Sequence, residues 1–139
     1  LAMLWGDGDL IKDPTGTTYP KDKQIKTTVA DQMEDENSLL RYYCKLLSIR
    51  HRNPIIARGT YSALSTDNKD LGGFLVTSDG ENAVILHNNS TEEITYDLSK
   101  CKALEGVNIS KITECIGVGT AKISDGLVTV GGQTSIILK

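Results

Sequence analysis

Three aspartates near the start of the chain are the residues whose type and spacing come nearest to a catalytic or metal-binding group. Asp7, Asp9 and Asp13 lie within a short glycine-containing segment, so their carboxylates could serve as an acid–base pair or as oxygen ligands. The calcium-loop pattern fails, because position 11 is Ile11 and no glutamate closes the loop. We interpret the three as solvated loop acids and predict neither a metal site nor a bound cofactor in this chain.

The histidines and cysteines form no recognised reactive arrangement. His51 and His87 are far apart in sequence and show no pattern of a nucleophile with its base, so both are expected to be surface or helix-end residues. Three cysteines without a C-x-x-C spacing predict no zinc site. Cys44 falls on an apolar helix face and is interpreted as a core residue. Cys101 and Cys115 could pair if their strands are neighbours, and the sequence leaves this open.

Length and composition limit the function classes. The chain has 139 residues, 39% of them hydrophobic and 24% charged, with a formal charge of −3. That is enough for one domain, or for a small domain with an appendage. The negative net charge does not indicate binding to nucleic acid or to an anionic membrane surface. No run approaches the roughly 18 apolar residues of a membrane-spanning helix.

The segment 35–54 carries the strongest helical pattern. Its apolar residues recur at spacings of three and four, at Leu39, Leu40, Tyr43, Leu46, Leu47 and Ile49. Asp35, Asn37 or Ser38 can cap its start, and Pro54 ends it. A helix that is apolar over so much of its surface needs partners, and no second helical pattern of comparable length is present. We therefore expect part of its packing surface to lie in sequence outside this chain.

The rest of the chain divides at this helix. Residues 1–34 lack periodicity and are rich in turn formers, which predicts a long irregular arm. After Pro54, short β-type runs alternate with turn signals, and Asp125-Gly126 is a two-residue hairpin signal. Strands are expected near 59–64, 72–77, 82–87, 93–98, 106–110, 112–118, 120–123, 127–130 and 134–138. This spacing predicts an antiparallel sandwich or barrel.

The junction between helix and strands resembles a known family. The residues that carry the resemblance are Gln32, Asp35, Ser38-Leu39-Leu40, Tyr42-Tyr43, Leu46, Arg50, Pro54 and Gly59-Thr60-Tyr61. They are similar to the passage from the last barrel helix to the C-terminal β-domain in the α-amylase family, glycoside hydrolase family 13. The resemblance implies that 1–54 are a remnant of a (β/α)8 barrel, a loop arm plus its final helix. It implies that 55–139 form an antiparallel Greek-key β-sandwich of the domain C type.

The resemblance also implies that catalysis lies elsewhere. The family uses a carboxylate nucleophile, a carboxylic acid/base and a third acid at the ends of earlier barrel strands, which this chain lacks. We therefore expect no catalytic residue here; Asp7, Asp9 and Asp13 lie on the wrong side of Trp5 to match the family's acids. Trp5 is the one candidate substrate-binding residue. Its ring either stacks on glucose beside the substrate groove or packs as core.

The resulting hypothesis is a catalytically silent C-terminal fragment of an enzyme that acts on starch and maltooligosaccharides. Its partner would be the missing catalytic barrel of the same polypeptide, which it would cover, with an extracellular bacterial enzyme favoured. The alternatives are a stand-alone carbohydrate-binding sandwich and a fragment of a related transglycosylase or isomerase. A binding module should expose a row of aromatic residues on one sheet face. Tyr61, Phe74 and Tyr96 fall one per strand and are interpreted as core or rim residues.

Overall fold

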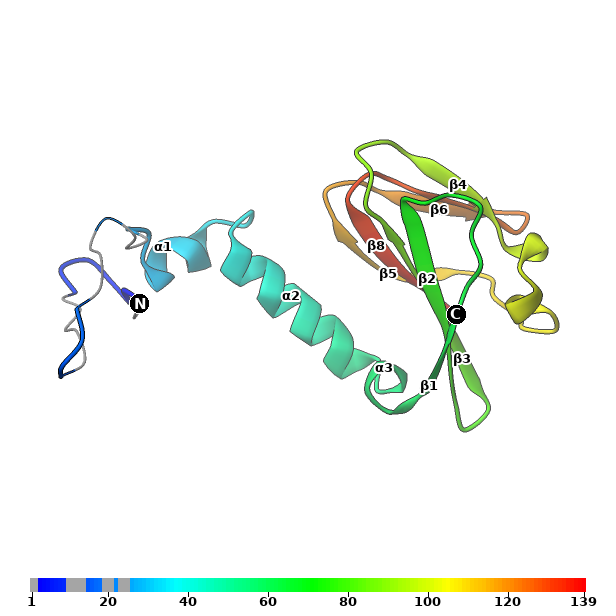
Figure 1. The fold of residues 1–139 in the computed structure, drawn as a ribbon, viewed down its shortest axis with the longest axis horizontal. Coiled ribbons are helices and arrows are strands. Elements are labelled where there is room, and N and C mark those ends of the chain that lie inside the picture. Colours follow the sequence, from blue (N-terminus) through cyan, green and yellow to red (C-terminus); the bar gives the residue numbers. More distant parts are fainter. Residues whose placement is uncertain (1–2, 10–14, 19–21, 23–25) are drawn as a thin grey trace. The chain divides into compact units, whose positions relative to one another are not determined.

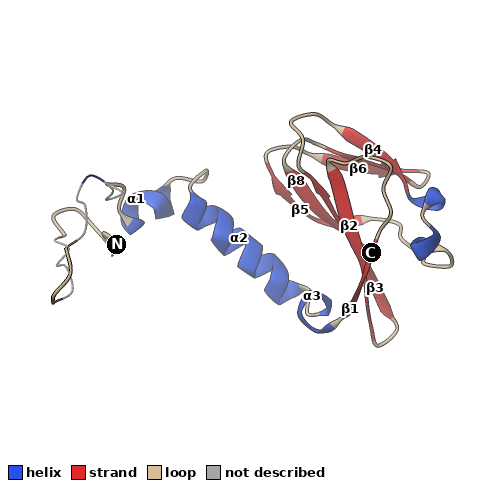
Figure 2. Cartoon of the chain, viewed as in Figure 1, coloured by secondary structure: helices blue, strands red, loops and turns tan. Residues whose placement is uncertain are grey.

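The computed structural model describes residues 3–9, 15–18, 22 and 26–139. The chain forms two compact units, Leu1–Ser48 and Ile49–Lys139. Figure 2 shows that helices dominate the first unit and strands the second. The predicted division at residues 54 and 55 concerns the domains of a parent enzyme and stays a prediction.

The first unit contains a short helix, α1 (Val29–Glu34), that the sequence pattern did not predict. A capping box defines its start: the Thr28 hydroxyl accepts a hydrogen bond from the Asp31 amide at 3.1 Å. The Asp31 carboxylate in turn accepts one from the Thr28 amide at 2.8 Å, which lowers the pKa of Asp31. The expectation of irregular structure throughout 1–34 was therefore wrong at its end. Six residues are too few to establish a helical period, and the Thr-x-x-Asp spacing was the available signal.

The long helix α2 (Leu39–Arg52) confirms the prediction for segment 35–54. Ser38 caps it, because its hydroxyl accepts a hydrogen bond from the Arg41 amide at 3.1 Å. The Asp35 carboxylate instead closes a turn by accepting one from the Asn37 amide at 2.9 Å. The helix ends directly before Asn53 and Pro54, and its last residues belong to the second unit.

The second unit is an antiparallel β-sandwich, as predicted, preceded by one short helix, α3 (Ile55–Arg58). The described strands are β1 (Thr60–Ala63), β2 (Leu71–Ser78), β3 (Glu81–Asn88), β4 (Ile94–Asp97), β5 (Ile112–Gly117), β6 (Ala121–Ser124), β7 (Leu127–Val130) and β8 (Thr134–Leu138). One sheet has the order β1-β2-β3-β8-β5, and the other has the order β4-β7-β6. Figure 1 shows β4 and β6 in one layer and β2, β8 and β5 in the other.

Two details of the sequence prediction for the strands have opposite outcomes. The β6–β7 hairpin is confirmed: Asp125 and Gly126 both have positive φ, 50° and 78°, as a type I′ turn requires. The strand expected at 106–110 was wrong. Two short 3₁₀ turns, η2 (Leu98–Lys100) and η3 (Lys102–Leu104), precede an irregular connection there. Their Leu98 and Leu104 side chains are buried and supply core contacts without a strand.

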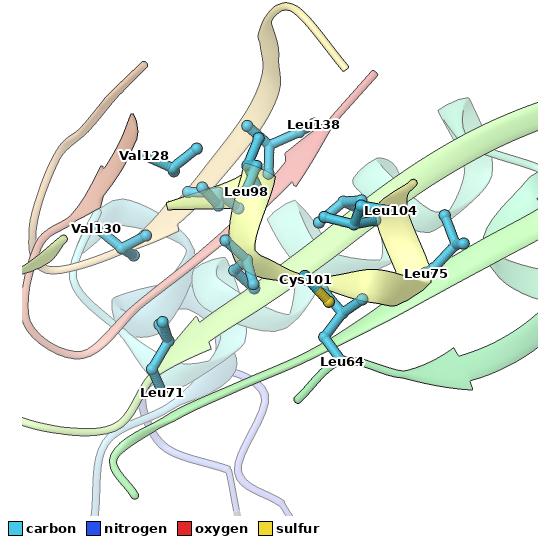
Figure 3. Close-up of a cluster of buried hydrophobic side chains, with 12 residues drawn as sticks. Leu64, Leu71, Leu75, Leu98, Cys101, Leu104, Val128, Val130 and Leu138 are labelled. Carbon is cyan, nitrogen blue, oxygen red and sulfur yellow. The ribbon is translucent and has the colours of Figure 1, made fainter. Parts of the chain in front are cut away.

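The main core lies between the two sheets. Figure 3 shows its side chains converging from the strands and from the 3₁₀ turns, with the sulfur of Cys101 among them. The members are Leu64, Leu71, Leu75, Val84, Leu86, Leu98, Cys101, Leu104, Val128, Val130, Ile136 and Leu138. A second, smaller cluster lies on the opposite face of the larger sheet. It consists of Ile49, Ile55, Val76, Ala83, Ile85 and Ile137, so α3 and the last turn of α2 cover part of that face.

Asn88, at the end of β3, ties the two sheets together. Its side chain is 2% exposed, and its amide nitrogen lies 2.9 Å from the carbonyl oxygen of Val130 and 3.0 Å from that of Gly131. The same nitrogen is 2.7 Å from the Glu92 carbonyl oxygen. A buried amide is stable only when it is hydrogen-bonded, so this one side chain makes sheet closure specific as well as favourable.

Candidate functional site

The described residues contain no catalytic or metal-binding constellation. No three histidine, cysteine or acidic side chains gather among them in a way that could hold a metal ion. The Asp9 carboxylate accepts hydrogen bonds from the amides of Trp5 and Gly6, at 2.9 and 2.7 Å, and so closes a local turn. Asp7 is exposed, and Asp13 lies outside the described residues. The expectation of no catalytic residue in this chain stays a prediction.

Trp5, the predicted sugar-contact residue, has an exposed side chain. The ring is 67% exposed, and the Trp5 carbonyl accepts a hydrogen bond from the Ala30 amide at 3.0 Å. The backbone at this position is therefore attached to the start of α1, while the ring has no core position among the described residues. Its role in sugar binding stays a prediction.

The cysteines carry no disulfide. Cys101 is buried in the main core, whereas Cys44 and Cys115 are exposed, and all three are free. The interpretation of Cys44 as a core residue was wrong, because the described residues do not cover its part of α2. Although the residue as a whole is exposed, partial desolvation of its thiol raises the pKa of Cys115, so the thiol stays protonated near neutral pH.

The most unusual surface of the first unit is an apolar stripe on α2, which we call the α2 stripe. It consists of Leu39, Tyr42, Tyr43, Leu46 and Leu47, which are 39–67% exposed. These residues follow the i, i+3, i+4, i+7, i+8 spacing of one helix face. Single exposed apolar residues are ordinary, but five on one face of a helix mark a surface that takes part in an interaction.

A buried polar atom lies on the same helix. The Nε of Arg41 is inaccessible to solvent and has no hydrogen-bond partner among the described residues. Leaving such a donor unpaired costs about 1–3 kcal/mol. This unpaired donor is a local cost of the way the helix is enclosed at Arg41.

The second unit exposes a row of aromatic rings on the outer face of the larger sheet. The rings of Tyr61 and Phe74 are 5.8 Å apart at 73°, and those of Phe74 and His87 are 6.5 Å apart at 70°. Tyr61 and Phe74 are 44% and 39% exposed, so the interpretation of both as core or rim residues needs correction. Because neighbouring rings are nearly perpendicular, they form edge contacts and no flat stacking surface for a sugar.

His87 belongs to this row but is more enclosed. Its Nδ1 lies 2.7 Å from the Ser135 hydroxyl, and burial lowers the pKa of the imidazole below its usual 6.5. The neutral ring is therefore favoured in the folded state. His51, by contrast, is exposed in the last turn of α2. Neither histidine has a nucleophile and an acid arranged around it.

An ion pair joins the end of α2 to strand β5. The Arg52 guanidinium donates to the Glu114 carboxylate at 2.9 and 3.2 Å, and the Asn53 side chain donates to it at 3.1 Å. The hydrogen bond from Arg52 holds the pKa of Glu114 below its ordinary value. The three side chains bond to one another within the second unit, so the arrangement is structural rather than reactive.

One pocket combines an apolar floor with converging polar groups. It has a volume of about 410 Å³ and lies between the β1–β2 connection and strand β4. Its lining residues are Ser65, Asp67, Asn68, Leu71, Ile94, Thr95, Tyr96, Asp97, Lys100 and Leu127. We refer to it as the β4 pocket. Sequence reasoning did not find it, because its two walls lie far apart along the chain.

No protein-family model matches the chain. The curated alpha-amylase SusG of Bacteroides thetaiotaomicron is 33% identical over 93 residues, which are 62% of this chain and 13% of that protein. An oligo-1,6-glucosidase of Bacillus cereus is 29% identical over 100 residues, which are 69% of this chain and 18% of that enzyme. The chain thus spans less than a fifth of the length of these relatives.

In the described part of the chain, no helix is long and apolar enough to cross a bilayer.

Solved structures show the same fold. Eubacterium rectale Amy13B is 27% identical and superposes with a TM-score of 0.79 over 100% of this chain, which corresponds to 27% of that protein. The trehalulose synthase MutB from Pseudomonas mesoacidophila MX-45 is 23% identical and superposes with a TM-score of 0.64 over 81% of this chain. At that identity the second likeness concerns the fold alone.

Proposed function

We propose that this chain completes an enzyme that hydrolyses α-glucans. The proposal starts from its homologues, which are α-amylase-family (glycoside hydrolase family 13) proteins matched in their C-terminal part. In this proposal the chain supplies no catalytic acid. It covers and stiffens a (β/α)8 barrel that belongs to the same polypeptide. The observation that carries the proposal is the α2 stripe, a helix face built for packing that the described residues leave exposed.

The substrate class follows from the named relatives. One is named an alpha-amylase and the other an oligo-1,6-glucosidase, so the two names agree on a glucose-based substrate without agreeing on one linkage. We therefore propose α-linked glucose oligomers as the substrate of the whole enzyme and assign no linkage. Trp5, exposed beside the start of α1, is the residue of this chain that we propose to reach that substrate.

The barrel is proposed as the partner because the α2 stripe offers an apolar face of the right kind. Barrel helices pack on one another and on the sheet beneath them through such faces. A free-standing sugar-binding module would have no need of this helix face.

The test begins with the coding sequence upstream of residue 1. We expect it to encode a (β/α)8 barrel with three carboxylates at the ends of its strands. In the whole enzyme, the double variant Tyr43→Glu with Leu46→Glu should lower the melting temperature, because it puts charge into a buried seam. The matched control Lys45→Glu changes a residue outside the stripe and should have little effect.

The isolated chain supplies the complementary result. It should hydrolyse neither starch nor maltooligosaccharides, and Tyr43→Glu with Leu46→Glu should leave its stability unchanged. An upstream sequence without a barrel, or glucan hydrolysis by the isolated chain, would contradict the proposal.

A further inference from the structure

The β4 pocket has walls that hydrogen bonds hold in place. Within the β1–β2 connection, the Asn68 side-chain oxygen accepts a hydrogen bond from the Asp70 amide at 2.9 Å. The Tyr96 hydroxyl, on β4, donates to the Ser65 carbonyl at 2.9 Å and so links the two walls. Burial, the neighbouring Cys101 and the carboxylates of Asp67 and Asp97 raise the pKa of Tyr96, so its hydroxyl stays a donor. A pocket formed in advance costs less conformational entropy on binding.

The polar groups at the rim include both acceptors and donors that are free to bind a ligand. The Asp67 carboxylate belongs to the pocket lining and is exposed to solvent. Lys100 is 75% exposed, and its ammonium lies 3.9 Å from Asp97, too far for a strong bond. The Asn68 side-chain nitrogen adds a further donor. Sugar hydroxyls both donate and accept, so they match such a mixture of groups.

The floor and the charge of the β4 pocket narrow the ligand class. Leu71 and Ile94 make part of the floor apolar, and the Tyr96 ring forms one side. Two carboxylates against one ammonium disfavour a phosphate or another anion. The volume of about 410 Å³ falls in the range of about 300–1,000 Å³ of small-molecule sites. A neutral polyhydroxylated ligand with apolar ring faces fits all three properties.

We propose that the β4 pocket is an auxiliary site that binds a short α-linked glucan. The proposal rests on the proposed function for the choice of glucan, and it goes beyond that function because it gives the sandwich a direct contact with substrate. Asp67 and Asn68 bind sugar hydroxyls from one wall, and Lys100 does so from the other. The sugar's apolar face lies toward Leu71 and the Tyr96 ring.

The experiment is a titration of the isotope-labelled 139-residue chain with maltotriose, followed by amide chemical shifts in NMR. We expect the largest shift changes at Asn68, Thr95 and Lys100, with millimolar affinity. The double variant Asp67→Ala with Lys100→Ala should weaken binding at least about 5-fold, as the loss of one or two hydrogen bonds predicts. Both residues are exposed, so the fold should survive the change.

Two controls make the result specific. The double variant Glu81→Ala with Lys122→Ala removes the same pair of charges from exposed positions outside the β4 pocket, and it should bind maltotriose as the parent chain does. Cellotriose, with β linkages, should give no changes in the pocket. Equal binding of cellotriose would overturn the assignment to α-glucans.

The remaining outcomes also decide the matter. Shift changes confined to Tyr61, Phe74 and His87, or none at millimolar maltotriose, would overturn the site. If that happens while the α2-stripe variants still destabilise the whole enzyme, the proposed function stands and only the auxiliary site fails. Binding in the β4 pocket together with an upstream sequence that lacks a barrel would support the site and overturn the enzyme assignment.

Discussion

Apolar residues have opposite environments in the two units of this chain. In the sandwich, the core residues of both clusters are at most 9% exposed; both sheets and the 3₁₀ turns enclose the main cluster, and α3 with the end of α2 covers the smaller one. On α2, the five residues of the stripe are 39–67% exposed, although their spacing is as regular as that of any core helix. The sandwich encloses its own core, whereas the α2 stripe has the spacing of a buried helix face but is left uncovered by the described residues.

This difference predicts that the sandwich core contributes most of the free energy of unfolding. Removing buried apolar atoms from the sandwich loses both transfer free energy and packing, whereas removing exposed atoms from the stripe loses little. Five measurements on the 139-residue chain test this contrast between the two units.

The largest effect is expected for Leu86→Ala, in the main core. Leu86 is fully buried, and such a truncation lowers the free energy of unfolding by about 2–5 kcal/mol. Urea unfolding followed by circular dichroism measures the change. A loss below about 1 kcal/mol would show that the sandwich core is not the main source of stability.

Asn88→Ala should have the next largest effect. The substitution removes the amide that bonds to the carbonyl oxygens of Glu92, Val130 and Gly131, so a loss of about 1–3 kcal/mol is expected. Asn82→Ala, at a less enclosed position of the same strand, is the control for urea unfolding. Equal effects of the two variants would refute the role of Asn88 in joining the sheets.

A smaller effect is expected from the pH dependence of His87. Its folded-state pKa is lowered, so its contribution is fully present above the unfolded value near 6.5 and is lost as pH falls through the folded value. Stability should therefore decline from about pH 6.5 downward. His87→Gln should flatten the decline in urea-unfolding free energy, whereas His51→Gln, changed at an exposed position, should not. A slope that survives His87→Gln would rule out this cause.

Glu114→Gln should cost still less. The pair with Arg52 is partly exposed, 17% on the glutamate side and 54% on the arginine side, so a loss of about 1 kcal/mol or less is expected near neutral pH. The lowered pKa of Glu114 makes this contribution present above about 4.5 and lost as pH falls through the folded value. The parent chain and the variant should thus converge in thermal stability at low pH. A constant difference down to pH 2 would contradict the assignment.

The smallest effect is expected for Leu47→Ala on the α2 stripe. Leu47 is 59% exposed, so its truncation should change the free energy of unfolding by no more than about 0.5 kcal/mol. Calorimetry on the isolated chain checks this. A loss as large as that of Leu86→Ala would mean that the stripe is already packed, and the contrast between the two units would disappear.

The sequence was informative where a local signal and a tertiary requirement agreed. Alternating runs and Asp125-Gly126 predicted the sandwich and one of its hairpins, and the apolar period up to Pro54 predicted α2. Short elements escaped, since α1 has only six residues and α3 four. The apolar residues near 106–110 were mistaken for a strand, because core contacts from loops and from strands look alike in sequence.

The candidate sites depended on information that the sequence does not contain. The aromatic row exists because β1 pairs with β2 in a register that places Tyr61 opposite Val76 and Ala63 opposite Phe74. A shift of one residue would send Tyr61 to the other face. The β4 pocket likewise requires the β1–β2 connection to meet a strand about thirty residues later. Strand register and contacts between distant segments are set by the whole fold, so neither site could be predicted from local sequence patterns.

The position of β8 in the larger sheet has a consequence for biosynthesis. Although it is the last strand along the chain, it lies between β3 and β5 and pairs with both. A nascent chain that has released β1 to β5 from the ribosome therefore still has a gap in the middle of its sheet, with two unpaired edges beside it. The sandwich can close only after residues 134–138 have emerged, so its folding is expected to wait for β8 and not to proceed strand by strand.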